Sequence, residues 1–172
     1  MRVESYILQL MFILLLARNV FCQTFSIEGG ANHFLGGLQK EIKIAPYFGT
    51  GLEIELSDYT AGYLQGSYSY LHLKSNSDFY GLHQFIGRAG IEIFSVLGVG
   101  ITLAGVRGKN ATPEAEQYML STNESEFGWN LHLKFSLLRI GKITFGTKIH
   151  YDKIWTKPKN SHLLQAGFFA AY

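Results

Sequence analysis

Residues 42–56 read IKIAPYFGTGLEIEL, and this stretch decides the fold. Every second position from Ile42 through Phe48 to Leu56 forms one mainly apolar row, and the positions between carry charged, small or aromatic residues. Successive side chains of a β-strand point to opposite faces, so this alternation predicts a long strand with one apolar face. Pro46 has no N–H to donate to a ladder, so we expect the strand to start after it or to carry a bulge there.

The same two-residue alternation recurs along the chain and predicts seven further strands. They are expected near residues 24–34, 59–74, 80–94, 97–104, 127–137, 143–152 and 161–172. In the segment 59–74 the apolar rows are out of phase, because Leu71 shares a face with Tyr63 whereas Leu64 lies on the other face. A bulge near Gly66 would bring the two halves into register.

The connections between these strands alternate in length. Those after the second, fourth and sixth strands are tight, near Ser57, Ser95 and Gly141, and the others are longer or more polar. The longest is the polar stretch 108–126. Short turns at one rim and longer loops at the other are typical of an even-numbered up-and-down barrel. The sequence therefore predicts an all-β fold, an eight-stranded antiparallel transmembrane β-barrel.

An apolar run precedes the first predicted strand. It covers residues 7–17, follows Arg2 and is broken by Arg18, which is typical of a secretory signal peptide. We expect residues 1–22 to be the signal peptide, with cleavage after Cys22, and residues 23–172 to be the barrel domain. Cys22 is the only cysteine, so the mature chain has no disulfide. The alternative is a lipid-modified Cys22, but residues 19–21 lack the small residue usual before such a cysteine.

Composition narrows the class of protein. The chain has 172 residues, enough for one domain, and 47% of them are hydrophobic while 16% are charged. This is too apolar for disorder, yet no run approaches the ~20 apolar residues of a membrane-spanning helix. A net charge of +2 gives no electrostatic argument for nucleic-acid binding.

The two rows of each strand predict where lipid and charge lie. In lipid every backbone polar group must be paired internally, so strands must close into a barrel with an apolar outer face. The opposite rows would then fill the narrow interior of an eight-stranded barrel with charges of both signs. We expect a polar network there, made of Glu53, Glu55, Arg88, Glu92, His132, Lys134, Lys148, His150 and Asp152. Aromatic girdles at the two rims are expected from Tyr47, Tyr80, Trp129, Tyr151 and Trp155.

This pattern resembles the small eight-stranded bacterial outer-membrane barrels of the OmpX and OmpA transmembrane-domain types. The resemblance covers nearly the whole mature chain and rests on pattern, not on a diagnostic motif. It implies a bacterial outer-membrane location, contact with lipid and lipopolysaccharide, and assembly by machinery that reads a C-terminal aromatic strand. We expect no cofactor and a non-enzymatic role in envelope structure, surface interaction or very narrow permeation. Tyr172 is expected to close the barrel against the strand that begins near Thr24.

Two other functions are open to the same pattern. A secreted lipocalin-like barrel would reverse the faces and bind a ligand inside, but the long apolar rows, the terminal aromatic strand and the absence of a disulfide favour the membrane. A lipid-modifying enzyme would need an oriented base, which His150 and Asp152 on one strand face suggest. However, no serine lies beside that pair, and the pair Ser161 and His162 has no evident acid. The six histidines show no spacing typical of a metal site.

Overall fold

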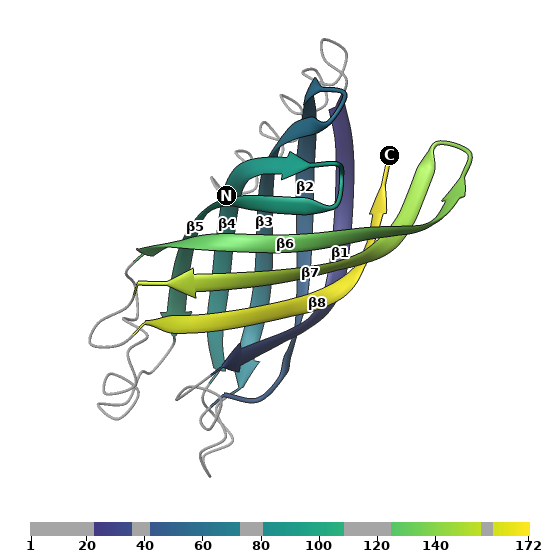
Figure 1. Cartoon of the computed structure of the whole chain (residues 1–172). Coiled ribbons are helices and arrows are strands. Elements are labelled where there is room, and N and C mark those ends of the chain that lie inside the picture. The colour runs from purple at the N-terminus through teal and green to yellow at the C-terminus, as the bar shows by residue number, and fades with distance from the viewer. Residues whose placement is uncertain (1–22, 36–41, 73–80, 109–124, 156–159) are drawn as a thin grey trace, which may run out of the picture.

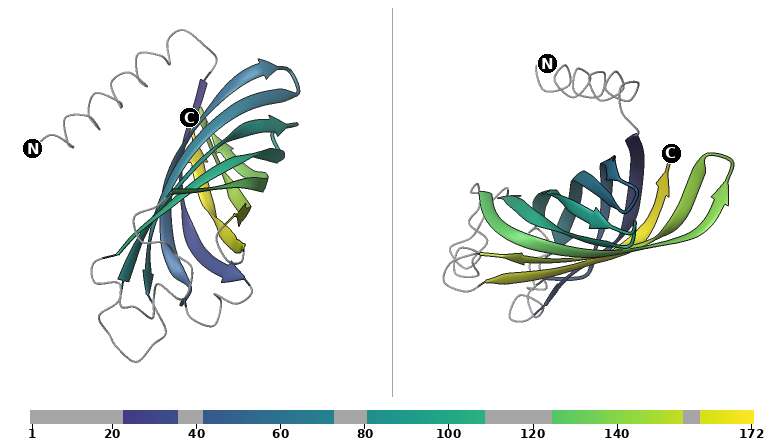
Figure 2. Two further views of the ribbon diagram at one scale, coloured as in Figure 1. Left: turned by 90° about the vertical axis from the view of Figure 1, so that its left-hand side faces the viewer. Right: turned by 45° about the horizontal axis from the view of Figure 1, so that its top comes forward.

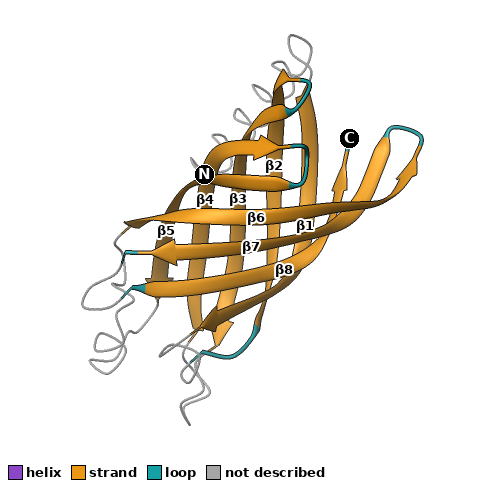
Figure 3. Ribbon diagram, viewed as in Figure 1, coloured by secondary structure: helices purple, strands orange, loops and turns teal. Residues whose placement is uncertain are grey.

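The computed structural model describes residues 23–35, 42–72, 81–108, 125–155 and 160–172. In these residues the chain forms eight strands and no helix (Figure 3). The strands are β1 (Gln23–Leu35), β2 (Ala45–Ser57), β3 (Thr60–His72), β4 (Gly81–Ile93), β5 (Leu97–Gly108), β6 (Ser125–Ile140), β7 (Ile143–Ile154) and β8 (Ser161–Ala171). The signal peptide expected at residues 1–22 and the girdle residue Tyr80 lie outside the described part.

The strands close into one barrel in sequence order. Each strand pairs antiparallel with its neighbour, and β8 pairs with β1 (Figure 1). The closing seam continues to Tyr172, whose N–H donates to the Phe25 carbonyl at 2.8 Å while the Phe25 N–H donates to the Tyr172 carbonyl at 3.0 Å. The predicted eight-stranded up-and-down barrel and the pairing of Tyr172 with the first strand are both confirmed.

Three tight turns lie at the same end of the barrel, which we call the short-turn rim (Figure 2). They occupy residues 58–59, 94–96 and 141–142, close to the predicted positions. In the turn after β4, Phe94 and Ser95 both have φ of 54°, and the Val96 N–H donates to the Ile93 carbonyl at 3.1 Å. Two successive residues with positive φ give a type I′ turn, whose twist matches that of the adjoining strands. The opposite end is the long-loop rim.

The two faces of the barrel differ in polarity. Phe48, Ile101 and Phe168 point outward and are 58%, 63% and 71% exposed, whereas Arg88 and Asp152 are 1% and 0% exposed. All carboxylates of the described strands lie on the inward rows. An apolar outside around a polar inside is what a bilayer requires of a strand protein. This polarity is the reverse of the one expected for a lipocalin-like barrel.

Strand β3 corrects one sequence-based expectation. It is regular from Thr60 to His72, and its pairing with β4 contains no register shift, so the bulge expected near Gly66 is absent. The irregularities fall elsewhere, between Glu55 and Ser57 and between Ser136 and Leu138. The apparent phase conflict arose because Leu71 points inward, into a part of the lumen that is apolar.

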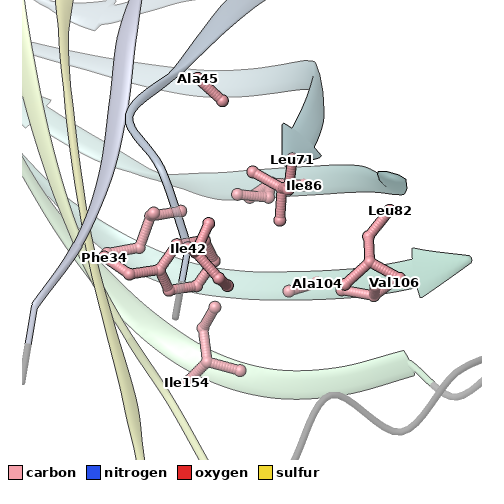
Figure 4. Packing of buried hydrophobic residues seen from close by; sticks show 10 residues of the cluster. Phe34, Ile42, Ala45, Leu71, Leu82, Ile86, Ala104, Val106 and Ile154 are labelled. Atoms are coloured by element: carbon pink, nitrogen blue, oxygen red, sulfur yellow. The ribbon is translucent and has the colours of Figure 1, made fainter. Parts of the chain in front are cut away.

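That apolar part of the lumen lies toward the long-loop rim (Figure 4). Its members, which we call the apolar cluster, are Phe34, Ile42, Ala45, Leu71, Leu82, Ile86, Ala104, Val106, Ile154 and Leu163. Ile42 precedes β2 and is only 1% exposed, so it leaves the outward row to which the sequence assigned it. The adjacent Lys43 N–H donates to the His72 carbonyl at 2.9 Å and holds this segment against β3.

Pro46 lies inside β2, contrary to both alternatives drawn from the sequence. The strand begins one residue earlier, at Ala45, and Pro46 pairs with Ala31 of β1. Pairing between β2 and β3 starts only at Tyr47, so the missing N–H of Pro46 leaves no gap in that ladder.

Candidate functional site: the polar lumen

Between the apolar cluster and the short-turn rim, the lumen is filled by polar and charged side chains. We call this set the lumen network. Eight of the nine residues predicted for such a network lie within it: Glu53, Arg88, Glu92, His132, Lys134, Lys148, His150 and Asp152. They come from β2, β4, β6 and β7, so the contacts join strands that are not neighbours in the sheet.

The centre of the network is an ion pair between Arg88 of β4 and Asp152 of β7. Arg88 Nε donates to Asp152 Oδ1 at 2.9 Å and its terminal nitrogen donates to Oδ2 at 2.7 Å, with both side chains fully buried. Thr102 donates a further hydrogen bond to Oδ1 at 2.7 Å, and Arg88 donates to Gln165 at 2.6 Å. In this bidentate geometry the hydrogen bonds and the opposite charges offset the cost of removing a guanidinium and a carboxylate from water.

A second group of charges lies nearer the short-turn rim. Glu92 contacts His132 Nε2 at 2.8 Å and Lys134 Nζ at 2.5 Å. Lys134 also donates to both oxygens of Glu53, at 2.9 and 2.8 Å. The His132 ring needs the glycine opposite it, because a Cβ at Gly98 would lie 2.0 Å from the imidazole.

Residues of the same type also lie side by side on β6 and β7. Lys134 pairs in register with Lys148, and His132 with His150, whose rings are 5.3 Å apart. His150 Nε2 lies 3.3 Å from Glu28 Oε2, and the buried Lys148 interacts electrostatically with the carboxylates of Glu28 and Glu53. Four buried or nearly buried carboxylates thus face three buried cations, which keeps the lumen close to neutral.

Neutral polar side chains extend the network to the level of the apolar cluster, where Gln84 lies between Leu82 and Ile86 on the inward row of β4. Asn32 donates to Ser69 at 2.9 Å and to Gln84 at 2.8 Å, and Ser69 donates to Gln84 at 3.0 Å. On the other side, the Tyr63 hydroxyl donates to Asn130 at 2.6 Å. The sequence prediction named only charged residues and histidines. Gln84 has the same alternation phase as Arg88 in β4, Asn130 the same as His132 in β6, and Asn32 the same as Glu28 in β1. That phase was the signal that could have found these neutral residues.

Two predicted positions differ in the structure. Glu55 is on the inward row, but it lies at the open short-turn rim, is exposed and forms no ion pair with any described residue. Tyr47 is 4% exposed and points into the lumen, so it is not part of an outer aromatic girdle. Trp129 and Tyr151 do lie on the outer face, with rings 5.4 Å apart, and Trp155 is 55% exposed.

The pairs considered for catalysis are not assembled. Asp152 is bound by Arg88 and Thr102, while His150 contacts Glu28 and Gln65, and among the described residues no hydrogen bond or ion pair joins His150 to Asp152. Ser161 is buried on the inward row, whereas His162 is on the outer row and is hydrogen-bonded to Tyr151. Within the described residues, no group of three or more His, Cys, Asp or Glu side chains is placed to hold a metal ion.

Comparison with known proteins supports the architecture. No family model and no curated protein sequence matches the chain. Among solved structures, the outer membrane protein OprG from Pseudomonas aeruginosa is similar, with a TM-score of 0.55 and 12% identity, covering 87% of this chain and 95% of OprG. The outer membrane protein Ail of Yersinia pestis gives a TM-score of 0.52 and 13% identity, covering 87% of this chain and 99% of Ail. The fold is that of a small outer-membrane barrel.

In a barrel of this kind, the network closes the interior. Arg88, Thr102, Asp152 and Gln165 come from four strands, are 0–1% exposed and contact one another across the lumen. A water-filled path along the axis at this level would leave these groups accessible to solvent. The lumen is therefore sealed at its centre, and no charged group of the described ion pairs there lines an open channel.

No described helix is long and apolar enough to cross a membrane.

Proposed function

We propose that this chain is a non-enzymatic integral protein of a bacterial outer membrane. It serves envelope structure or surface interaction through the connections at its long-loop rim. The observation that carries this proposal is the combination of an apolar outer face with a lumen sealed by the buried pair Arg88–Asp152. A sealed lumen leaves the rims and the outer wall as the surfaces available for a function.

The proposed partners follow from that location. The outer wall contacts lipid, and the long-loop rim faces the leaflet that contains lipopolysaccharide. The seam between β8 and β1 is the last pairing needed to close the barrel, so we propose that the assembly machinery acts on this edge. Catalysis is not proposed, because neither histidine pair is arranged with an orienting acid and a nucleophile.

Membrane fractionation with a gel-shift comparison tests the proposal. The protein is expected in the outer-membrane fraction and is expected to migrate differently before and after boiling, since a closed barrel resists unfolding by detergent. Recovery in the soluble periplasmic fraction without heat-dependent migration would overturn it.

Two further measurements test the sealed, non-enzymatic lumen. In planar bilayers the purified protein should give no steady conductance steps; large regular steps would contradict a sealed barrel. Cells carrying His150→Ala should keep the lipid profile of the parent strain, and loss of a modified lipid would revive the enzyme hypothesis.

A further inference from the structure

Basic side chains of the outer wall are confined to one half of the barrel. The ionisable Lys, Arg and His residues on outward strand positions are His33, His72, His83, Arg107, Lys153 and His162, all in the half near the long-loop rim. No carboxylate of the described strands is on an outward row. A ring of basic groups on a wall whose described strands carry no outward carboxylate is complementary to an anionic layer at that depth of the membrane.

Two of these cations occur in the same local arrangement. Tyr68 and His83 Nδ1 are hydrogen-bonded at 2.8 Å, and His83 pairs in register with Arg107. On the far strands, Tyr151 and His162 Nδ1 are hydrogen-bonded at 2.6 Å, and His162 pairs in register with Lys153. In each case a tyrosine orients the imidazole next to the cation, which is a geometry suited to binding the oxygens of a phosphate.

Beside the first arrangement, the outer wall is hollowed. A groove of about 910 Å³ runs across β2–β5, within the size range of pockets that hold small ligands (~300–1,000 Å³). Its walls are apolar and aromatic, formed by Phe48, Tyr68, Phe85 and Leu103, and Arg107 lies on its lining. The groove therefore combines space for a hydrocarbon chain with one positive charge.

The groove is open because of two glycines that packing does not require. Gly66 and Gly87 are paired in register on the outer face of β3 and β4. A Cβ at Gly66 would meet nothing within 4 Å, and one at Gly87 would meet only the Leu103 carbonyl oxygen, at 3.9 Å. Other residues fit these positions, so their effect is to leave a hollow in the lipid-facing wall.

We propose that this groove is a binding site for a phosphorylated glycolipid of the outer leaflet, the lipid A part of lipopolysaccharide. One phosphate binds Arg107 beside His83, and one acyl chain lies over Gly66 and Gly87, next to the contacting rings of Tyr68 and Phe85. The inference rests on the proposed outer-membrane location and adds a defined lipid and its site. Arg107 has no ion-pair partner among the described residues, so no carboxylate in the described part of the chain competes with the phosphate there.

Binding measured with two matched pairs of variants tests the site. The folded protein in phosphatidylcholine nanodiscs is titrated with bisphosphorylated lipid A, dephosphorylated lipid A or phosphatidylglycerol, and bound lipid is quantified by native mass spectrometry. Arg107→Gln removes the charge, and Lys142→Gln is its control at the short-turn rim. Gly87→Leu fills the groove, and Gly62→Leu is its control on the outward face of β3, where a Cβ meets only ordinary contacts at 3.7 Å and beyond.

Arg107→Gln is expected to weaken lipid A binding by about tenfold, which is the loss typical of one charge-assisted contact. Gly87→Leu is expected to weaken it by about the same factor, because the leucine side chain occupies the space of the acyl chain. The two control variants should bind like the unmodified protein, and dephosphorylated lipid A should bind weakly to all of them. Equal binding of dephosphorylated lipid A, preferential binding of phosphatidylglycerol, or equal losses in the controls would each overturn the site. Fractionation of the unmodified protein is done first. A failure of the proposed outer-membrane location is then distinguished from a failure of the proposed lipid A site.

Discussion

The two halves of the lumen are equally buried but are held by different forces. Near the long-loop rim Leu71 and Leu163 are 0% exposed and contact other hydrocarbon, while nearer the short-turn rim Asp152 and His150 are 0% exposed and contact polar groups. Apolar side chains can lose a neighbour and leave a small cavity. A buried charge that loses its partner stays uncompensated, because neither water nor another polar group replaces that partner. Both apolar and polar side chains close the barrel, but the polarity of the site decides how much stability a substitution there removes.

The largest expected effect is on the central ion pair. Arg88→Ala leaves Asp152 buried without its guanidinium, and we expect it to lower the free energy of unfolding by about 3–5 kcal/mol. The measurement is a urea titration in lipid vesicles, followed by the gel shift between folded and unfolded protein.

The double variant Arg88→Met with Asp152→Leu distinguishes charge from packing. It removes both charges and keeps most of the volume, so it should recover most of the lost stability. A double variant as unstable as Arg88→Ala would show that the two halves of the lumen do not differ in the way described.

In the apolar half, Leu71→Ala is expected to cost about 2–4 kcal/mol in the same titration, because it opens a cavity in the apolar cluster. Leu64→Ala on the outward face of the same strand is the control. Its side chain is 58% exposed toward lipid, and acyl chains as apolar as leucine can fill the space it leaves. Equal losses for the two variants would argue against a packed interior at Leu71.

The smallest effect contrasts two glutamates of β2 that are two residues apart. Glu53→Gln weakens both hydrogen bonds from Lys134 and should cost about 1–2 kcal/mol. Glu55 is exposed at the rim, and Glu55→Gln should stay within about 0.5 kcal/mol of the unmodified protein. A larger effect at Glu55 than at Glu53 would place the end of the lumen network differently.

The sequence was sufficient for the strands and the turns because both depend on local patterns. The alternation in residues 42–56 and the tight connections near Ser57, Ser95 and Gly141 required no knowledge of distant partners. Even there Ile42 was assigned to the wrong face, since nothing local shows that the chain turns into the lumen before Ala45.

The contacts inside the barrel were beyond the sequence because they depend on how far the strands are staggered around it. Arg88 and Asp152 are 64 residues apart on strands that are not neighbours, so their pairing follows from closure and not from spacing. The same holds for Leu71, whose inward apolar side chain is accommodated because it is buried in one cluster with Phe34 and Leu163. A prediction that assumes a uniformly polar lumen assigns such an apolar residue to the wrong face of its strand.

The type I′ turn at Phe94 and Ser95 has a consequence for insertions and deletions. The three-residue connection 94–96 fixes which residues of β4 and β5 are opposite each other, from Ile93 and Leu97 to Leu82 and Gly108. One added residue that moved β4 by a single position would turn Arg88 and Glu92 toward the bilayer. Changes in chain length are therefore excluded from the short-turn rim, and foreign peptides for surface display belong at the opposite end.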